Sequence, residues 1–269
     1  MVTMTSPTRS RVQTQLDAAY LIVDTESIPD GRLLRLTKYP DQQISDEEAI
    51  ERARNEARES SFTGSDFIPV PFQIPVAVCV ARVARDYTLT KITCLDTPRF
   101  RPEEIVRQFW LGLERYNAKL VTFNGRGFDM PMLELAALRH GCSGLNYFQK
   151  SRNRFSGSID LMDWLTNFGA YRLVGGLNVL AKMLGLPGKM DVAGDQVLQM
   201  YREGRYQDIN DYCLCDTLDT YFIFLRTRVM TGELTLEREA AIVEQSRQFL
   251  AQQAIETPVL KQYLDSWSN

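Results

Sequence analysis

The sequence predicts an α/β fold, and three observations carry that prediction. Short apolar runs rich in β-branched residues, typical of buried strands, occur at 21–26, 76–83, 89–95 and 119–123. An amphipathic helix is predicted from Pro102, so that a helix separates the third strand from the fourth. From Gly176 onward the chain is nearly all helix. We therefore expect a sheet flanked by helices, with three adjacent antiparallel strands and a helical C-terminal half.

Length and composition indicate one large globular domain. The chain has 269 residues, of which 44% are hydrophobic and 24% are charged, and these values are ordinary for a protein that buries a substantial core. We expect a flexible tail at 1–18, a main domain at 19–230, and a C-terminal helical extension at 231–269 that packs on the same domain.

A charged segment at 30–71 is inserted in the main domain. It opens with the turn signal Pro29-Asp30-Gly31, and the residues from Ser45 to Glu48 form a capping-box-like start that predicts a helix over 46–59. That helix carries six acids and three arginines with almost no apolar stripe, so we expect it to be solvated. A plain surface excursion is the simpler interpretation of this insertion, and a mobile flap beside a functional site is the alternative.

Charge and cysteine content narrow the class of protein. A net charge of -3 argues against a protein that coats long duplexes, although it leaves room for a local grip on a few nucleotides. The five cysteines are odd in number and form no C-x-x-C pair, which is typical of reduced thiols in a cytoplasmic protein. The first eighteen residues are polar, and no apolar run approaches eighteen residues, so we expect neither secretion nor a membrane span.

Two carboxylates, Asp24 and Glu26, end the first predicted strand. Strand side chains alternate with period two, so both acids project from one face while Thr25 points away. At roughly 4 Å and an effective dielectric near 20, two like charges repel by about 4 kcal/mol. Such a pair needs a cation, a raised pKa or separation into water. A cation site is our hypothesis; the alternative is that both acids mark where a core strand emerges into solvent.

Two further groups of polar residues follow later in the chain. Asp129 lies where the strand at 119–123 passes through a glycine-containing turn into a helix, a position that suits a ligand-binding residue and a helix N-cap equally well. Tyr212 and Asp216 are spaced i, i+4 on a helix predicted over 206–229, so they share one face. A half-buried tyrosine beside a solvated aspartate is the alternative for this pair.

Together and in this order, the three groups resemble the exonuclease motifs of the DEDD superfamily, in its tyrosine subgroup. The closest resemblance is to the family of predicted 3′–5′ exonucleases related to the proofreading domain of B-family DNA polymerases. It covers roughly residues 20–228, including the segments 158–163 and 184–189. The motif residues are Asp24-Thr25-Glu26, Phe123-Asn124-Gly125 through Met130-Pro131, and Tyr212-Cys213 through Asp216. The resemblance implies a ribonuclease H-like fold with a central mixed five-stranded sheet flanked by helices.

The resemblance also implies an activity and its cofactors. The expected reaction is hydrolysis of phosphodiester bonds from the 3′ end of single-stranded nucleic acid, with DNA favoured, releasing nucleoside 5′-monophosphates. Two Mg²⁺ or Mn²⁺ ions would share the site, because two hard ions can clamp the attacking and leaving oxygens between carboxylates. By the family's pattern Asp24 bridges both ions, Glu26 and Asp216 hold one, Asp129 holds the other, and Tyr212 orients the attacking water. No polymerase motif accompanies these residues, so a stand-alone exonuclease is expected.

Candidate nucleic-acid-binding residues are Thr25, Asn124, Phe128 and Lys189. Asn124 would fix its loop or touch the terminal sugar, and Phe128 would stack on the last base or belong to the core. Lys189, together with Lys150, Arg152 and Arg154, offers positive charge to a phosphate backbone. Two other functions remain as alternatives: a catalytically silent ribonuclease H-like binding module, and a phosphoesterase for small substrates.

Overall fold

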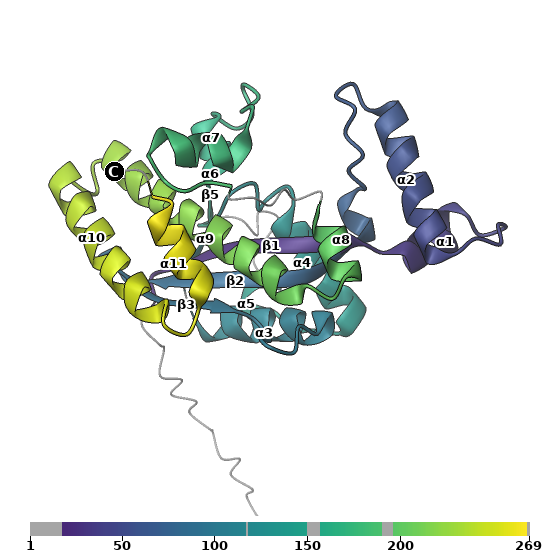
Figure 1. Cartoon of the computed structure of the whole chain (residues 1–269), viewed down its shortest axis with the longest axis horizontal. Coiled ribbons are helices and arrows are strands. Elements are labelled where there is room, and N and C mark those ends of the chain that lie inside the picture. The colour runs from purple at the N-terminus through teal and green to yellow at the C-terminus, as the bar shows by residue number, and fades with distance from the viewer. Residues whose placement is uncertain (1–17, 117, 150–156, 190–195, 268–269) are drawn as a thin grey trace, which may run out of the picture.

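The computed structural model describes residues 18–116, 118–149, 157–189 and 196–267, and its centre is a five-stranded sheet (Figure 1). The strand order is β3-β2-β1-β4-β5, in which β2 runs antiparallel to β1 and β3, while β4 runs parallel to β1 and β5. The strands are β1 (Tyr20–Pro29), β2 (Gln73–Val83), β3 (Leu89–Cys94), β4 (Lys119–Thr122) and β5 (Ile159–Asp160). The predicted mixed five-stranded sheet, with three neighbouring antiparallel strands, is thereby confirmed.

The central strand β1 pairs with its two neighbours over different lengths. It pairs with β2 along its whole length, with one irregularity between Glu26 and Ser27. It pairs with β4 only over Tyr20–Ile22. The prediction that the strand ends at Glu26 is wrong, because pairing with β2 carries it on to Pro29. Asp24 and Glu26 therefore lie within the strand, just beyond the stretch that β4 covers.

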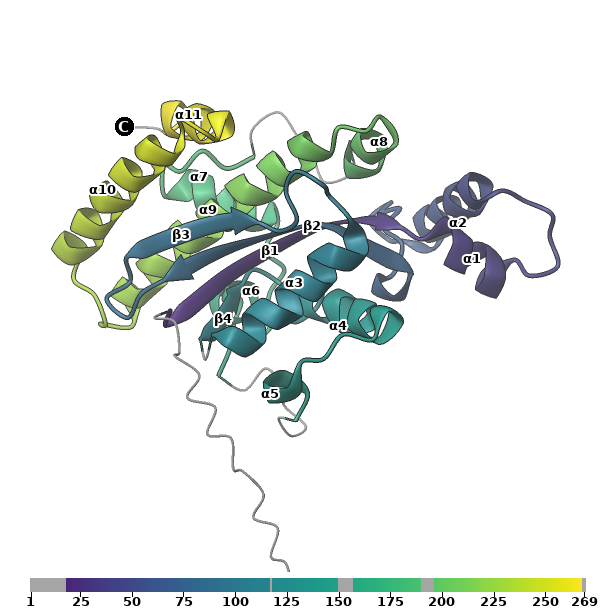
Figure 2. The same ribbon diagram turned by 90° about the horizontal axis from the view of Figure 1, so that it is seen from below.

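Helices cover both faces of the sheet, as the view from below in Figure 2 shows. Leu21 and Val23 belong to an apolar cluster with α3 (Pro102–Arg115) and α4 (Asp129–His140), near the short α5 (Leu145–Phe148). Ile22 and Ile28 belong to a larger cluster dominated by α9 (Tyr206–Met230). The period-two alternation of β1 thus assigns odd-numbered residues to the α3–α4 side and even-numbered residues to the α9 side.

The inserted segment folds as an arm of two helices that projects beyond the sheet (Figures 1 and 2). The arm consists of α1 (Gly31–Lys38), α2 (Asp46–Ser60) and the 3₁₀ turn η1 (Val70–Phe72). The capping box at Ser45 is present. The expected lack of an apolar stripe is wrong, because Ala49, Ile50 and Ala53 are buried in a cluster that includes Leu34 of α1. Helix α1 was not predicted, since its N-cap Asp30 belongs to what appeared to be a simple turn.

The C-terminal half is helical and packs on the α9 side. Its other helices are α6 (Leu161–Leu165), α7 (Gly176–Met183), α8 (Val197–Arg202), α10 (Leu236–Gln253) and α11 (Pro258–Asp265). Buried residues of α10 and α11, such as Leu250 and Tyr263, belong to the same apolar cluster as α9. The predicted tail at 1–18 lies, except for Ala18, outside the described residues. Among the described helices, none has the length and apolar character needed to cross a bilayer.

Candidate active site

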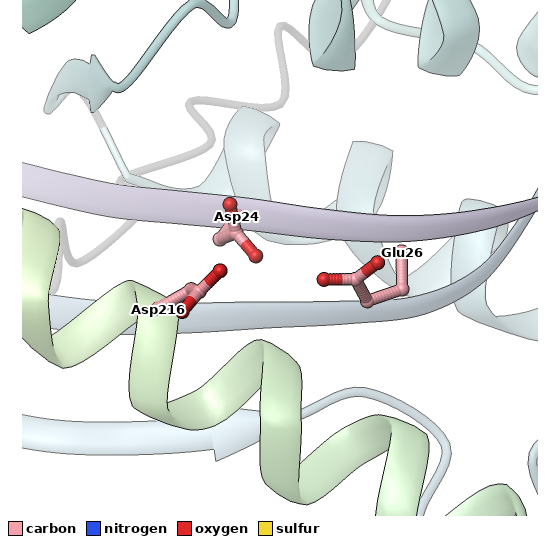
Figure 3. Close-up of side chains that lie close together, drawn as sticks. All are labelled: Asp24, Glu26 and Asp216. Atoms are coloured by element: carbon pink, nitrogen blue, oxygen red, sulfur yellow. The ribbon is translucent and has the colours of Figure 1, made fainter. Parts of the chain in front are cut away.

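Three carboxylates from two distant elements meet beside β1. Asp24 and Glu26 extend from β1 on the side that faces α9, and Asp216 extends from α9 toward them (Figure 3). One oxygen atom from each lies within 4.8 Å of the others. We call Asp24, Glu26 and Asp216 the acid cluster. The predicted convergence of the first and third groups of polar residues is therefore present in the structure.

A thiol contact fixes α9 against β1 at this point. The Cys213 Sγ lies 3.3 Å from the backbone carbonyl oxygen of Asp24, to which it donates a hydrogen bond. Cys213 is fully buried, so this contact belongs to the core rather than to the reacting surface. It sets the position of the helix turn that carries Asp216 relative to the strand residue that carries Asp24.

The acid cluster is an electrostatically strained arrangement in the absence of a cation. Burial, followed by the charges of the neighbouring acids, raises the pKa of Asp24 and of Glu26 well above the ordinary values. Burial also raises the pKa of Asp216 to about 6, although the positive charge of Lys189 opposes that shift. In addition, the Oδ2 atom of Asp24 is buried without a hydrogen-bond partner. An all-oxygen set with an unpartnered buried carboxylate atom fits a hard divalent ion such as Mg²⁺ or Mn²⁺.

Tyr212 lies one helical turn before Asp216 and shares its face. Its side chain is 8% exposed. A hydrogen bond from its hydroxyl lowers the pKa of Asp216, while burial and the acid cluster raise the pKa of Tyr212 above the ordinary value. The phenol therefore remains a neutral hydrogen-bond donor at the edge of the acid cluster.

Asp129 reaches the same strand from its opposite face. Helix α4 begins at Asp129, and a carboxylate oxygen of Asp129 accepts a hydrogen bond of 2.5 Å from the Thr25 hydroxyl. Asp129 is not the N-cap of α4, because Phe128 occupies that position. Burial raises the pKa of Asp129 to about 7, and the hydrogen bond from Thr25 opposes the shift. Asp129 lies outside the acid cluster, but its charge contributes to the raised pKa of Asp24.

The loop that delivers Asp129 has its own anchor, Asp160. The two carboxylate oxygens of Asp160 accept hydrogen bonds from the backbone N–H groups of Asn124 and Arg126, each at 2.9 Å. Asn124 adopts a left-handed backbone with φ of 64°, and its carbonyl oxygen accepts hydrogen bonds from the N–H groups of Gly127 and Phe128. The structure therefore places Asn124 as a loop-forming residue.

Gly125 is required for this loop to turn back over β4. A Cβ atom on Gly125 would lie 2.4 Å from side-chain atoms of Thr122, which is too close for any real contact. Sequence reasoning singled out the glycines of this turn but assigned no role to Asp160. The sequence feature that could have identified Asp160 is its position between a strand and a helix, where it also caps α6.

The remaining predicted binding residues differ in exposure and in the groups they contact. Lys189 is exposed, yet its positive charge lowers the pKa of Glu26 and of Asp216. It therefore lies close enough to interact with the acid cluster. Phe128 is partly buried and adjoins Asp129 in the chain. Thr25 is 4% exposed and is engaged with Asp129, which leaves it little surface for a nucleotide. Lys150, Arg152 and Arg154 lie outside the described residues.

A second buried aspartate on α9, Asp219, is not part of the acid cluster. Its Oδ1 accepts a hydrogen bond of 2.8 Å from the hydroxyl of Tyr263 on α11. Burial raises the pKa of Asp219 to about 7, and the Tyr263 hydrogen bond opposes that shift. This contact connects the C-terminal extension to the helix that carries Tyr212 and Asp216.

Comparison with known families adds an independent finding. A family model described as predicted 3′–5′ exonuclease related to the exonuclease domain of PolB matches residues 65–267. The match includes Asp129, Tyr212 and Asp216, whereas Asp24 and Glu26 precede it in β1. No curated protein matches the chain. The geometry of the site, and not the family match, therefore connects Asp24 and Glu26 to the matched residues.

Proposed function

The chain belongs to the family of predicted 3′–5′ exonucleases related to the exonuclease domain of PolB, and from this we propose that it hydrolyses phosphodiester bonds at the 3′ end of single-stranded nucleic acid. We favour DNA as substrate and nucleoside 5′-monophosphates as products. The sheet order and the position of the acids also support a ribonuclease H-like fold.

The observation that carries the proposal is the acid cluster. Asp24 and Glu26 come from the central strand, and Asp216 comes from a helix in the last third of the chain, yet their oxygens lie within 4.8 Å. Burying three like charges at such a distance is costly unless a cation or protons neutralise them. The Oδ2 atom of Asp24, buried without a protein hydrogen-bond partner, adds support for a cation at this place.

We propose that the site takes two divalent ions, the first of them at the acid cluster. Asp24, Glu26 and Asp216 would hold one, and Asp129 with Asp24 would hold the other. When bound, the ions would supply the positive charge that stabilises the attacking and leaving oxygens of a phosphodiester. Thr25 keeps the Asp129 carboxylate in place by its hydrogen bond.

The other side chains position the substrate and the attacking water. Tyr212, which remains protonated and already contacts Asp216, would donate a hydrogen bond that orients this water. The exposed Lys189 would attract the phosphate toward the acids, because its positive charge lies close enough to lower the pKa of Glu26 and of Asp216. Tyr212 and Lys189 would thus act in the same step, in which the attacking water is aligned with the phosphorus atom and the leaving oxygen.

The proposal is tested by incubating the protein with 5′-labelled single strands, with and without Mg²⁺ or Mn²⁺. We expect a ladder that shortens from the 3′ end and depends on the ion. Asp24→Ala should lower the rate by about 10³-fold or more, because it removes several kcal/mol of charge stabilisation. Asp208→Asn is a matched control, since Asp208 lies on α9 but its side chain is 45% exposed and paired with Arg205.

Each alternative function has its own outcome in this experiment. Binding of the strands without cleavage would indicate a silent binding module, and phosphate release from mononucleotides alone would indicate a small-substrate phosphoesterase. Full activity of a folded Asp24→Ala protein would contradict the assignment of the acid cluster. Asp24→Asn, which conserves shape, and circular dichroism separate loss of chemistry from loss of fold.

A further inference from the structure

The inserted arm touches the candidate active site through one aromatic contact. Phe67 lies on the segment that returns from α2 to the sheet, and its ring meets the ring of Phe128 edge-on, with centroids 5.7 Å apart and planes at 62°. Phe128 immediately precedes Asp129 in the chain. A residue inserted between the first two strands therefore lies one side chain away from the loop that carries a proposed metal ligand.

Phe67 is held in place by its neighbours in the chain. Asp66 accepts hydrogen bonds from Arg54 at 2.6 Å and from Arg58 at 3.0 Å, which fasten the returning segment to α2. On the other side, Ile68 is 2% exposed within the apolar cluster of the arm. The backbone at Phe67 is thus fixed on both sides.

The Phe67 side chain nevertheless remains uncovered. It is 52% exposed, and it borders a cavity of about 690 Å³ between the returning segment and the two helices of the arm. An aromatic ring that the backbone holds firmly, yet leaves half in water beside a buried acid site, has no explanation in the packing of the arm itself. The ring therefore contacts Phe128 and still keeps about half of its surface open to solvent.

Ion pairs also join the arm to the rest of the protein, and they help to fix the position of the Phe67 ring relative to the site. Asp30, which caps α1, forms an ion pair with Arg139 of α4, and Glu51 of α2 lies 3.9 Å from Arg202 of α8. These two pairs and the Phe67–Phe128 contact connect the arm to the helices on both sides of β1. The arm therefore presents Phe67 in a defined place.

We propose that Phe67 and Phe128 together form a platform on which the unpaired bases at the 3′ end of the substrate stack, so that the inserted arm contributes to substrate binding. This inference rests on the proposed exonuclease function. Base stacking on aromatic rings tolerates any sequence, because every base presents a π face. A platform of this kind favours strands whose terminal bases are unpaired, and it leaves the chemistry to the acids.

The experiment compares Phe67→Ala, Phe67→Trp and the control Phe62→Ala in cleavage of a single-stranded oligonucleotide. Phe62 is the matched control because it lies in the same loop and is fully exposed. Phe67→Ala should raise KM by about tenfold, the value of one lost base stack, without changing kcat. Phe67→Trp should retain the parental KM, and Phe62→Ala should have no effect. Binding measured in Ca²⁺ by fluorescence anisotropy should follow the same order.

A substrate series identifies the base as the partner of Phe67. If the 3′-terminal bases are replaced by abasic sites, the parent should bind more weakly and Phe67→Ala should then bind no worse than the parent. An unchanged KM for Phe67→Ala, in a parent that degrades the strand, would overturn the platform and leave the exonuclease intact. A parent that binds with Phe67 dependence but does not cleave would support the platform and overturn the exonuclease, and a parent that does neither would overturn both.

Discussion

At the scale of single residues, the site depends on side chains that share a face. Asp24 and Glu26 do so through the period of a strand, and Tyr212 and Asp216 through the turn of a helix. Both relations are local, so the residue types and their spacing were enough to predict them. The contact between Asp216 and the two strand acids is not local, and only the folded chain shows its distance.

The Tyr212 hydroxyl provides a first prediction at this scale. Tyr212→Phe should lower kcat by about 10²-fold, the cost of a misplaced reactant, while the affinity for a single strand changes little. Steady-state kinetics and binding in Ca²⁺ measure the two effects separately. The same variant should also raise the pKa of Asp216, since the hydroxyl lowers it in the parent. Equal losses in kcat and in affinity would contradict the assigned role.

Asp160 shows why another residue escaped sequence reasoning. Its two carboxylate oxygens bind backbone N–H groups of a loop that lies 36 and 34 positions earlier in the chain. A side chain that binds backbone groups leaves no pattern of residue types in the segment it binds. The aspartate at the start of a helix was visible in the sequence, but its second function was not.

At the scale of elements, removal of Asp160 should loosen the loop that positions Asp129. Asp160→Ala should lower the free energy of unfolding by about 1–2 kcal/mol, because it removes the acceptor of the partly buried Asn124 N–H group and the N-cap of α6. It should also lower activity. Asp163→Ala is the control: it removes only the ion pair with the half-exposed Arg126 and should cost less than about 1 kcal/mol. Urea titration measures both, and equal losses would contradict the anchoring role.

The contact between α11 and α9 leads to a further prediction at this scale. Tyr263→Phe removes the hydrogen bond to buried Asp219, so it should lower the free energy of unfolding by about 1–3 kcal/mol and raise the pKa of Asp219. Tyr171→Phe is the control: the exposed Tyr171 donates its hydroxyl hydrogen bond to the backbone carbonyl oxygen of Leu165, so its loss should have a smaller effect. Thermal and urea melts of the two variants measure these effects. A larger loss for Tyr263→Phe would mean that α11 stabilises α9, and equal small losses would contradict this.

The arm illustrates where helix prediction fails. Helix α2 was predicted from its capping box, which is a local signal in the sequence. Its three buried apolar residues form a stripe too short to stand out from the charges around it, and α1, which completes their burial, begins directly after a proline-containing turn. The partner of a short stripe, and the closeness of Phe67 to Phe128, depend on tertiary packing that no local pattern contains.

At the scale of the whole molecule, the buried acids predict an unusual dependence of stability on pH. The pKa values of Asp216 and Asp129 rise from 3.8 to about 6 and about 7 in the metal-free protein. Between the ordinary pKa of 3.8 and these raised values, the folded protein binds more protons than the unfolded chain. The contribution of these two groups to the free energy of unfolding therefore falls as the pH rises through this range. Thermal melts in chelator should show a lower Tm at roughly pH 8 than at roughly pH 5.

Divalent ions should reverse that trend, because they bind the deprotonated carboxylates and only in the folded state. We expect Mn²⁺ or Mg²⁺ to raise the Tm more at roughly pH 8 than at roughly pH 5. Asp24→Asn should flatten the pH profile in chelator and weaken the response to the ion. A parent whose Tm is indifferent to both ions at the higher pH would contradict the metal site.

Because Asp24 and Glu26 belong to the first strand while Asp216 belongs to α9, a chain leaving the ribosome carries two of the three acids long before the third is translated. The larger apolar cluster is built around α9 as well. If the proposed function is right, the capacity to cleave and the larger part of the core therefore form together, and a chain that ends before α9 lacks both.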